Sequence, residues 1–216
     1  MSHLSSIAFT VRQTLSAHGI SLSTGHAQQL VAAALGHNNL ASYQASSDDD
    51  GLPDAASMVL DPARLQTRAA QLGHDDSAFA QALTSALKAR FPDAGIYDDH
   101  EAWLIDTQSH FEYLIINEDS VSSEVAMTNG TFPRVYVELP WWDTLGEYYG
   151  DNLSTDFEGL VTVDPDEDRV YYGHEIDVRA SLTVERFGRR LFGRCHVDAV
   201  HAKLRWFGGE PDELLD

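Results

Sequence analysis

The chain has 216 residues, 43% of them apolar, and its 34 acidic and 14 basic side chains give a formal net charge of −20. This composition supports a folded core in one large domain or two small ones, and the acidity disfavours nucleic acid and anionic lipid as partners. A single cysteine, Cys195, excludes an internal disulfide, and no apolar run approaches the length of about 18 residues that crosses a membrane. With no signal-like N-terminus, these features favour a cytoplasmic protein.

Helical spacing of apolar residues dominates the first half of the chain. It predicts helices near residues 4–18, 24–35, 41–43, 62–72, 76–91 and 100–117, with one or two further turns within 119–128. Between the third and fourth of these helices, residues 46–53 carry three successive aspartates and are expected to form a loop. Asp61 and Pro62 are a typical helix start, and Gly73 a typical helix end.

After residue 128 the apolar period changes to two, which is typical of strands. Val135 and Val137 indicate one strand and residues 160–163 another. Residues 176–185 alternate without error, and a turn at Gly188 leads to a long strand over 191–204. Its apolar phase slips between Ala199 and Val200, which predicts a β-bulge there.

The predicted fold is therefore α+β: a helical N-terminal half followed by an antiparallel β-sheet of about four strands. We divide the chain into a helical module, residues 1–92, and an α+β region with a C-terminal antiparallel hairpin, residues 93–216. The two could also form one continuous domain.

Residues 20–45, ISLSTGHAQQLVAAALGHNNLASYQA, contain Leu22, Leu30, Leu35, Gly36 and Tyr43 at a characteristic spacing. This pattern resembles the glyoxalase-related N-terminal helical module of bacterial plasmid and integrative-element proteins. The following VLDPARLQTRAAQL resembles the segment that often comes next in such proteins, so the likeness extends over residues 20–72. The resemblance implies a bacterial mobile-element context and no particular activity. His37 stands where that family more often has an aromatic residue.

Acidic side chains gather in one part of the sequence: residues 101–168 contain sixteen carboxylates and a single cation, Arg134. Within this segment, aromatic residues are interleaved with carboxylates, which suits cation–π and salt contacts with Arg or Lys side chains. The candidate partner-binding residues are Trp141, Trp142, Asp143, Glu147, Tyr148, Tyr149 and Asp151. The alternatives are that the tryptophans cover the sheet, and that the acidity is a general adaptation to high salt.

Four arginines form a second candidate site near the predicted hairpin turn: Arg186, Arg189, Arg190 and Arg194. They could pair with the acidic segment of the same chain or form a patch for an anionic ligand or partner.

Other patterns give weaker indications of chemistry. Asp164, Asp166, Asp168 and Glu175 have the carboxylate spacing of a calcium loop, but Arg169 stands where that loop requires glycine. His196 and His201 would share one face of a strand only if the bulge is present. Three helices at the start of the chain suit a DNA-binding motif, but residues 1–60 contain only one fixed cation, Arg12.

These observations predict an acidic, non-enzymatic interaction protein that binds a basic protein partner. An inhibitor, anti-defence or immunity-type factor that occludes a nucleic-acid-binding enzyme would fit. The hypothesis requires no cofactor or metal and involves neither direct nucleic-acid nor membrane contact. The alternatives are a metal- or carboxylate-dependent enzyme and a regulator that binds DNA through its N-terminal helices. The sequence leaves the partner's identity and the oligomeric state open.

Overall fold

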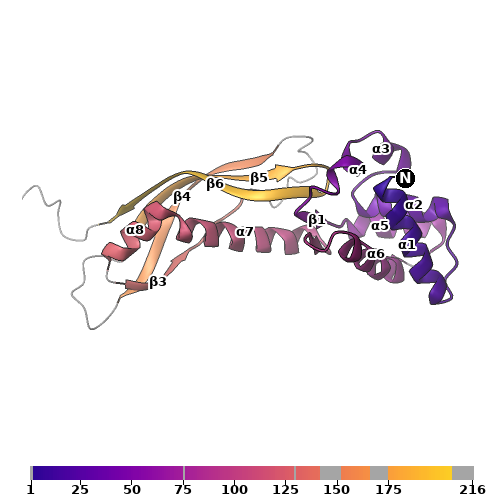
Figure 1. Ribbon diagram of the computed structural model, residues 1–216, viewed down its shortest axis with the longest axis horizontal. Helices are drawn as coiled ribbons and strands as arrows, with labels where there is room; N and C mark the ends of the chain where they lie inside the picture. Colours follow the sequence, from indigo (N-terminus) through magenta and orange to yellow (C-terminus); the bar gives the residue numbers. More distant parts are fainter. Residues whose placement is uncertain (1, 75, 129, 142–151, 166–174, 206–216) are drawn as a thin grey trace, which may run out of the picture. The chain divides into compact units, whose positions relative to one another are not determined.

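The computed structural model describes residues 2–74, 76–128, 130–141, 152–165 and 175–205. It is an α+β structure (Figure 1). Its helices are α1 His3–Ala17, α2 Thr24–Ala34, α3 Leu40–Gln44, α4 Asp48–Gly51, α5 Pro62–Leu72, α6 Asp76–Arg90, α7 His100–Asn117 and α8 Asp119–Met127. Its strands are β1 Ser57–Val59, β2 Gly95–Tyr97, β3 Gly130–Val135, β4 Leu153–Pro165, β5 Glu175–Arg186 and β6 Leu191–Leu204.

The strands form a single six-stranded sheet in the order β2-β1-β6-β5-β4-β3. β1 pairs with β2 in parallel and with β6 antiparallel, so the sheet is mixed. The prediction of about four antiparallel strands was therefore wrong in number and in type. β1 and β2 have three residues each, which is too short for a period of two to be visible in the sequence.

The described residues fall into two compact units that are not contiguous in sequence. The first contains residues 2–104, 152–153 and 184–194. The second contains residues 105–141, 154–165, 175–183 and 195–205. The boundary expected at residue 92 lies inside the first unit, and the turn between β5 and β6 belongs to that unit as well.

In the first unit, the helix boundaries follow local chemistry. The Ser23 side chain accepts a hydrogen bond from the His26 amide at the start of α2. Asp61 caps α5 in the same way and Pro62 occupies its first turn, while Gly73 ends it with a φ of +72°. These predicted boundaries are confirmed. The inward stripes of α1, α2, α5 and α6 pack into one hydrophobic core.

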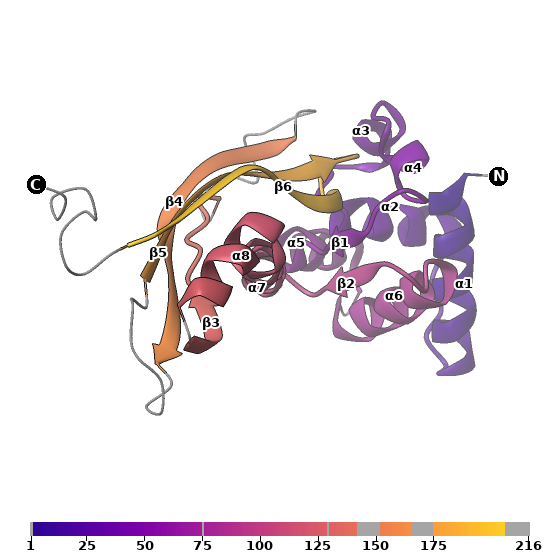
Figure 2. The ribbon, with the colours of Figure 1, turned by 60° about the vertical axis from the view of Figure 1, so that its left-hand side comes forward.

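In the second unit, the sheet curls around α7 and α8, which lie against one of its faces (Figure 2). The alternation predicted for β5 is confirmed, because Ile176, Val178, Ala180 and Leu182 are buried while their neighbours are exposed or half-buried. The predicted irregularity in β6 is also confirmed. Ala199 has a φ of +52°, and the more buried side chains change from odd to even positions there.

Candidate functional site

The turn between β5 and β6 is seated against the N-terminal helices of the same unit. Three glycines make this close approach possible, since any side chain there would collide with neighbouring atoms. A Cβ atom at Gly51 would lie 2.5 Å from the Phe187 carbonyl oxygen, and one at Gly188 would lie 2.8 Å from the Asp48 carboxyl carbon. Gly36 has a φ of +84° and leaves room for the Arg190 side chain. The turn is thus fixed in place by shape.

A buried histidine–aspartate pair lies where the turn meets the helices. His37 Nε2 is 2.9 Å from Asp48 Oδ2, and the Arg189 backbone amide donates to the same oxygen at 3.0 Å. Burial raises the pKa of Asp48, but the hydrogen bonds from His37 and Arg189 outweigh it and hold that pKa below its ordinary value. The carboxylate is therefore ionised at neutral pH and accepts the Nε2 proton of His37.

Asp48 and its neighbours were expected to lie in a loop, and that expectation was wrong. Residues 48–51 form the short helix α4, and Asp48 is buried. Asp49 also points inward: it accepts hydrogen bonds from the backbone amides of His3 and Leu4 and from the Tyr43 hydroxyl. Asp49 therefore connects α4 to α1 and α3, and Asp48 connects it to His37 and to the turn between β5 and β6, roles that sequence alone did not reveal.

The four arginines proposed as an anion-binding patch do not form one exposed surface. Arg186 is 8% exposed, donates to the Gly188 and Arg189 carbonyl oxygens, and lies 5.8 Å from the Phe192 ring centre. Arg190 pairs with Asp61 at 3.0 Å. Only Arg194 is exposed. Intramolecular pairing is correct for Arg190, although its partner caps α5 and is not part of the 101–168 segment.

The described part of the acidic segment corrects the prediction for Trp141. Its side chain is 3% exposed and contacts Phe111, with ring centres 6.3 Å apart. It therefore packs against α7 and is not available to a partner. The remaining candidates lie outside the described residues; they are Trp142, Asp143, Glu147, Tyr148, Tyr149 and Asp151.

Two exposed tyrosines of the second unit are each the sequence neighbour of a residue in a hydrogen bond that sequence reasoning missed. The Val137 amide donates to Glu112 Oε1 at 3.1 Å, which ties the extended residues after β3 to α7. Tyr113 and Tyr136, the neighbours of the two bonded residues, are 63% and 71% exposed. Glu138, two residues after Tyr136 in the sequence, is exposed as well. We call Glu112, Tyr113, Tyr136 and Glu138 the tyrosine–glutamate surface.

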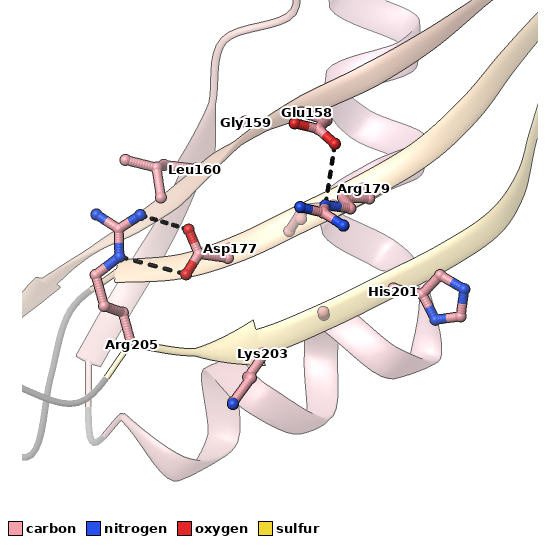
Figure 3. A pocket seen from close by; sticks show the side chains of 10 residues that line it. Glu158, Gly159, Leu160, Asp177, Arg179, His201, Lys203 and Arg205 are labelled. Carbon is pink, nitrogen blue, oxygen red and sulfur yellow. Dashed lines mark hydrogen bonds and ion pairs between the residues drawn. The ribbon is translucent and has the colours of Figure 1, made fainter. Parts of the chain in front are cut away.

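A shallow pocket of about 630 Å³ lies on the outer face of β4, β5 and β6 (Figure 3). Ion pairs cross it: Arg179 pairs with Glu158 at 3.0 Å, and Arg205 bridges Asp177 and Glu175. At the far side of β4, Arg134 pairs with Asp164. Arginines of the same unit therefore neutralise part of the acidic sheet face.

Neither the calcium-loop spacing nor the histidine pair of β6 forms a metal site among the described residues. Asp164 and Glu175 pair with arginines, and Asp166 and Asp168 lie outside the described residues. His196 and His201 are both exposed on β6. Within the described ranges, no three His, Cys, Asp or Glu side chains are placed to hold a metal ion.

Cys195 is expected to be an unreactive thiol. Burial and the nearby Asp106 carboxylate raise its pKa to about 12, so little thiolate exists near neutral pH. Its reaction with a thiol reagent in the folded protein should be at least about tenfold slower than in the urea-unfolded chain, where the pKa returns to about 8.5. Equal rates in the two states would contradict this assignment.

No helix within the described residues is both long and apolar enough to cross a membrane. None of the protein-family models matches this chain, and no curated protein or solved structure is significantly similar to it.

Proposed function

We propose that this chain is an acidic, non-catalytic interaction protein that binds a basic partner through the tyrosine–glutamate surface. An inhibitor, anti-defence or immunity-type role, in which its carboxylates replace the phosphates of a nucleic acid, is the specific form of this proposal. It rests above all on two exposed tyrosines, each next to a residue of the Val137–Glu112 hydrogen bond, in a segment with sixteen carboxylates and one cation.

The chemistry of the surface suits Arg and Lys side chains. A tyrosine ring attracts a cation through its face, and a neighbouring carboxylate adds a charge-assisted hydrogen bond. Tyr113 and Tyr136 supply the rings, while the exposed Glu138 supplies the carboxylate. The net charge of −20 would steer a basic partner toward the protein before contact.

The position of Arg12 favours this proposal over DNA binding by the N-terminal helices. Its Nε donates to the Leu22 carbonyl oxygen at 2.9 Å and its Nη1 to Thr24 Oγ1 at 2.8 Å. The one fixed cation among residues 2–60 is therefore occupied inside the helical module. Phosphate contacts need several available Lys or Arg side chains.

The proposal predicts a specific loss of binding when the surface is changed. An oligo-arginine peptide is the probe, and its affinity for the full chain is measured by fluorescence anisotropy at low and high salt. The double substitution Tyr113→Ala/Tyr136→Ala should weaken binding about tenfold, because each cation–π contact contributes roughly 0.5–1 kcal/mol at exposed sites. Binding should also weaken with rising salt.

Matched controls separate this surface from acidity in general. Phe9→Ala removes an aromatic ring that is 58% exposed in the first unit, and Asp54→Asn removes an exposed carboxylate there, for comparison with Glu138→Gln. If these controls weaken peptide binding as much as the tyrosine and Glu138 variants do, binding reflects net charge alone and the proposed surface is wrong.

A further inference from the structure

Two histidines from different helices meet in the first unit. His26 lies in the first turn of α2, and His74 directly follows the glycine that ends α5. The rings approach each other nitrogen to nitrogen: His26 Nδ1 is 2.8 Å from His74 Nε2, and the ring planes are inclined by 70°. Both residues are half-buried, so a small ion can reach the pair from solvent.

Local hydrogen bonds hold the backbone at both histidines. The Ser23 side chain accepts a hydrogen bond from the His26 amide at 3.2 Å, which fixes the first turn of α2. The His74 amide donates to the Ala69 carbonyl oxygen at 2.9 Å, and Gly73, with a φ of +72°, allows the chain to fold back in this way. α2 and α5 also share one hydrophobic core. The fold therefore places the two imidazoles together, whatever lies between them.

The distance between the two nitrogens suits a shared metal ion as well as a hydrogen bond. Imidazole nitrogens bind Zn²⁺ at about 2.0–2.1 Å, so two of them on one tetrahedral ion lie about 3.3 Å apart. The observed 2.8 Å is shorter by about 0.5 Å. Small rotations of the two half-buried side chains supply this change and turn both lone pairs toward one ion.

We propose that His26 Nδ1 and His74 Nε2 bind one divalent transition-metal ion and thereby link the start of α2 to the end of α5. Imidazole suits Zn²⁺, Cu²⁺ and Ni²⁺, whereas Mg²⁺ and Ca²⁺ prefer oxygen ligands. Water completes the coordination, since within the described ranges no third His, Cys, Asp or Glu forms a metal-binding group with the pair. The tyrosine–glutamate surface belongs to the other unit, and the inference does not depend on the proposed basic partner.

The test is a titration of the full chain, without a histidine tag, with Zn²⁺ and separately with Mg²⁺. Calorimetry should show a saturable site for Zn²⁺ that Mg²⁺ does not fill. Long-range ¹H–¹⁵N spectra should show His26 Nδ1 and His74 Nε2 shifting with the same affinity, and these spectra decide the question on the wild-type chain even if a variant does not fold. His26→Gln and His74→Gln should each weaken binding about tenfold or more, because loss of a ligand costs at least as much as loss of a group that orients one.

The control is the double variant His196→Gln/His201→Gln, which removes two exposed imidazoles from β6 in the other unit. It should leave the affinity for Zn²⁺ within about twofold of wild type. Circular-dichroism melting verifies that the variants fold, and Zn²⁺ should raise the melting temperature of wild type and of the control by mass action. The proposal is overturned if Zn²⁺ does not bind saturably, if the two ring nitrogens do not respond, or if the control weakens binding as much as either single variant.

Discussion

Trp103→Ala is expected to lower the free energy of unfolding by about 3–5 kcal/mol, the usual cost of removing a large buried aromatic side chain. Trp103 is 1% exposed and stacks on Phe192, with ring centres 4.2 Å apart. His100 also stacks on the indole, with ring centres 5.7 Å apart. The substitution would leave a cavity between the start of α7 and the beginning of β6, which relaxation of these rings fills only in part. Urea denaturation measures the loss.

Phe9→Ala is the matched control for Trp103→Ala, because it also truncates an aromatic ring in the first unit but at a site that is 58% exposed. It should change the free energy of unfolding by no more than about 0.5 kcal/mol. A Trp103 variant as stable as the Phe9 variant would show that the stack does not support the unit.

Asp48→Asn is expected to destabilise the protein by about 3–5 kcal/mol near neutral pH, because it breaks a buried pair and leaves His37 without its carboxylate. Because the folded-state pKa of Asp48 is lowered, its contribution is present above the pKa of the unfolded carboxyl group. It is lost as the pH falls through the folded value. The difference between wild type and variant should therefore shrink below about pH 4.

The control for Asp48→Asn is the same change at Asp50, an exposed carboxylate on α4. Chemical denaturation across the acidic range measures both variants. A constant stability difference between wild type and Asp48→Asn from neutral to acidic pH would contradict the assigned ionisation. So would an equal loss in Asp50→Asn.

The sequence was sufficient to predict those structural features that depend only on residues close together in the chain. Helix caps at Ser23, Asp61 and Gly73 act within one turn, and the alternation of β5 reports which face is buried. The phase slip at Ala199 located the irregularity in β6 to the residue. Each of these features depends on neighbours close in the chain.

The prediction for Trp141 failed although a usable signal was present. Val135, Val137, Leu139 and Trp141 continue one alternation, and all four are buried, while Tyr136 and Glu138 occupy the exposed phase. Extending the period of two by six residues would have placed Trp141 inside and Tyr136 outside. The partner-binding prediction groups these residues by chemical type, which ignores the direction of each side chain.

The seated turn could not have been predicted, because its contacts join residues far apart in sequence. Arg189 and Asp48 are separated by 141 positions, and Arg190 and Asp61 by 129. Gly36, Gly51 and Gly188 were each compatible with an ordinary turn or helix end. That these positions need glycine, with no side chain, can be recognised only when the residues packed against them are known.

Charge counting along the sequence also overstated the free negative charge. Glu158, Asp164, Glu175 and Asp177 pair with Arg134, Arg179 and Arg205 inside the second unit. The arginines at the turn take no part in these pairs. When charged residues are counted by sequence segment, these arginines and carboxylates fall into different groups. In the folded sheet, neighbouring strands bring them into contact.

Because the first compact unit draws on residues 184–194 as well as on residues 2–104, it is not a contiguous piece of the polypeptide. A fragment that ends at residue 104 would lack residues 184–194, which pack against Gly36 and Gly51. Its core would then lack the buried side chains of Leu191 and Phe192. The N-terminal helices expressed alone would thus lack part of their compact unit. A chimera that transfers these helices to another protein would have to include the β5–β6 turn as well.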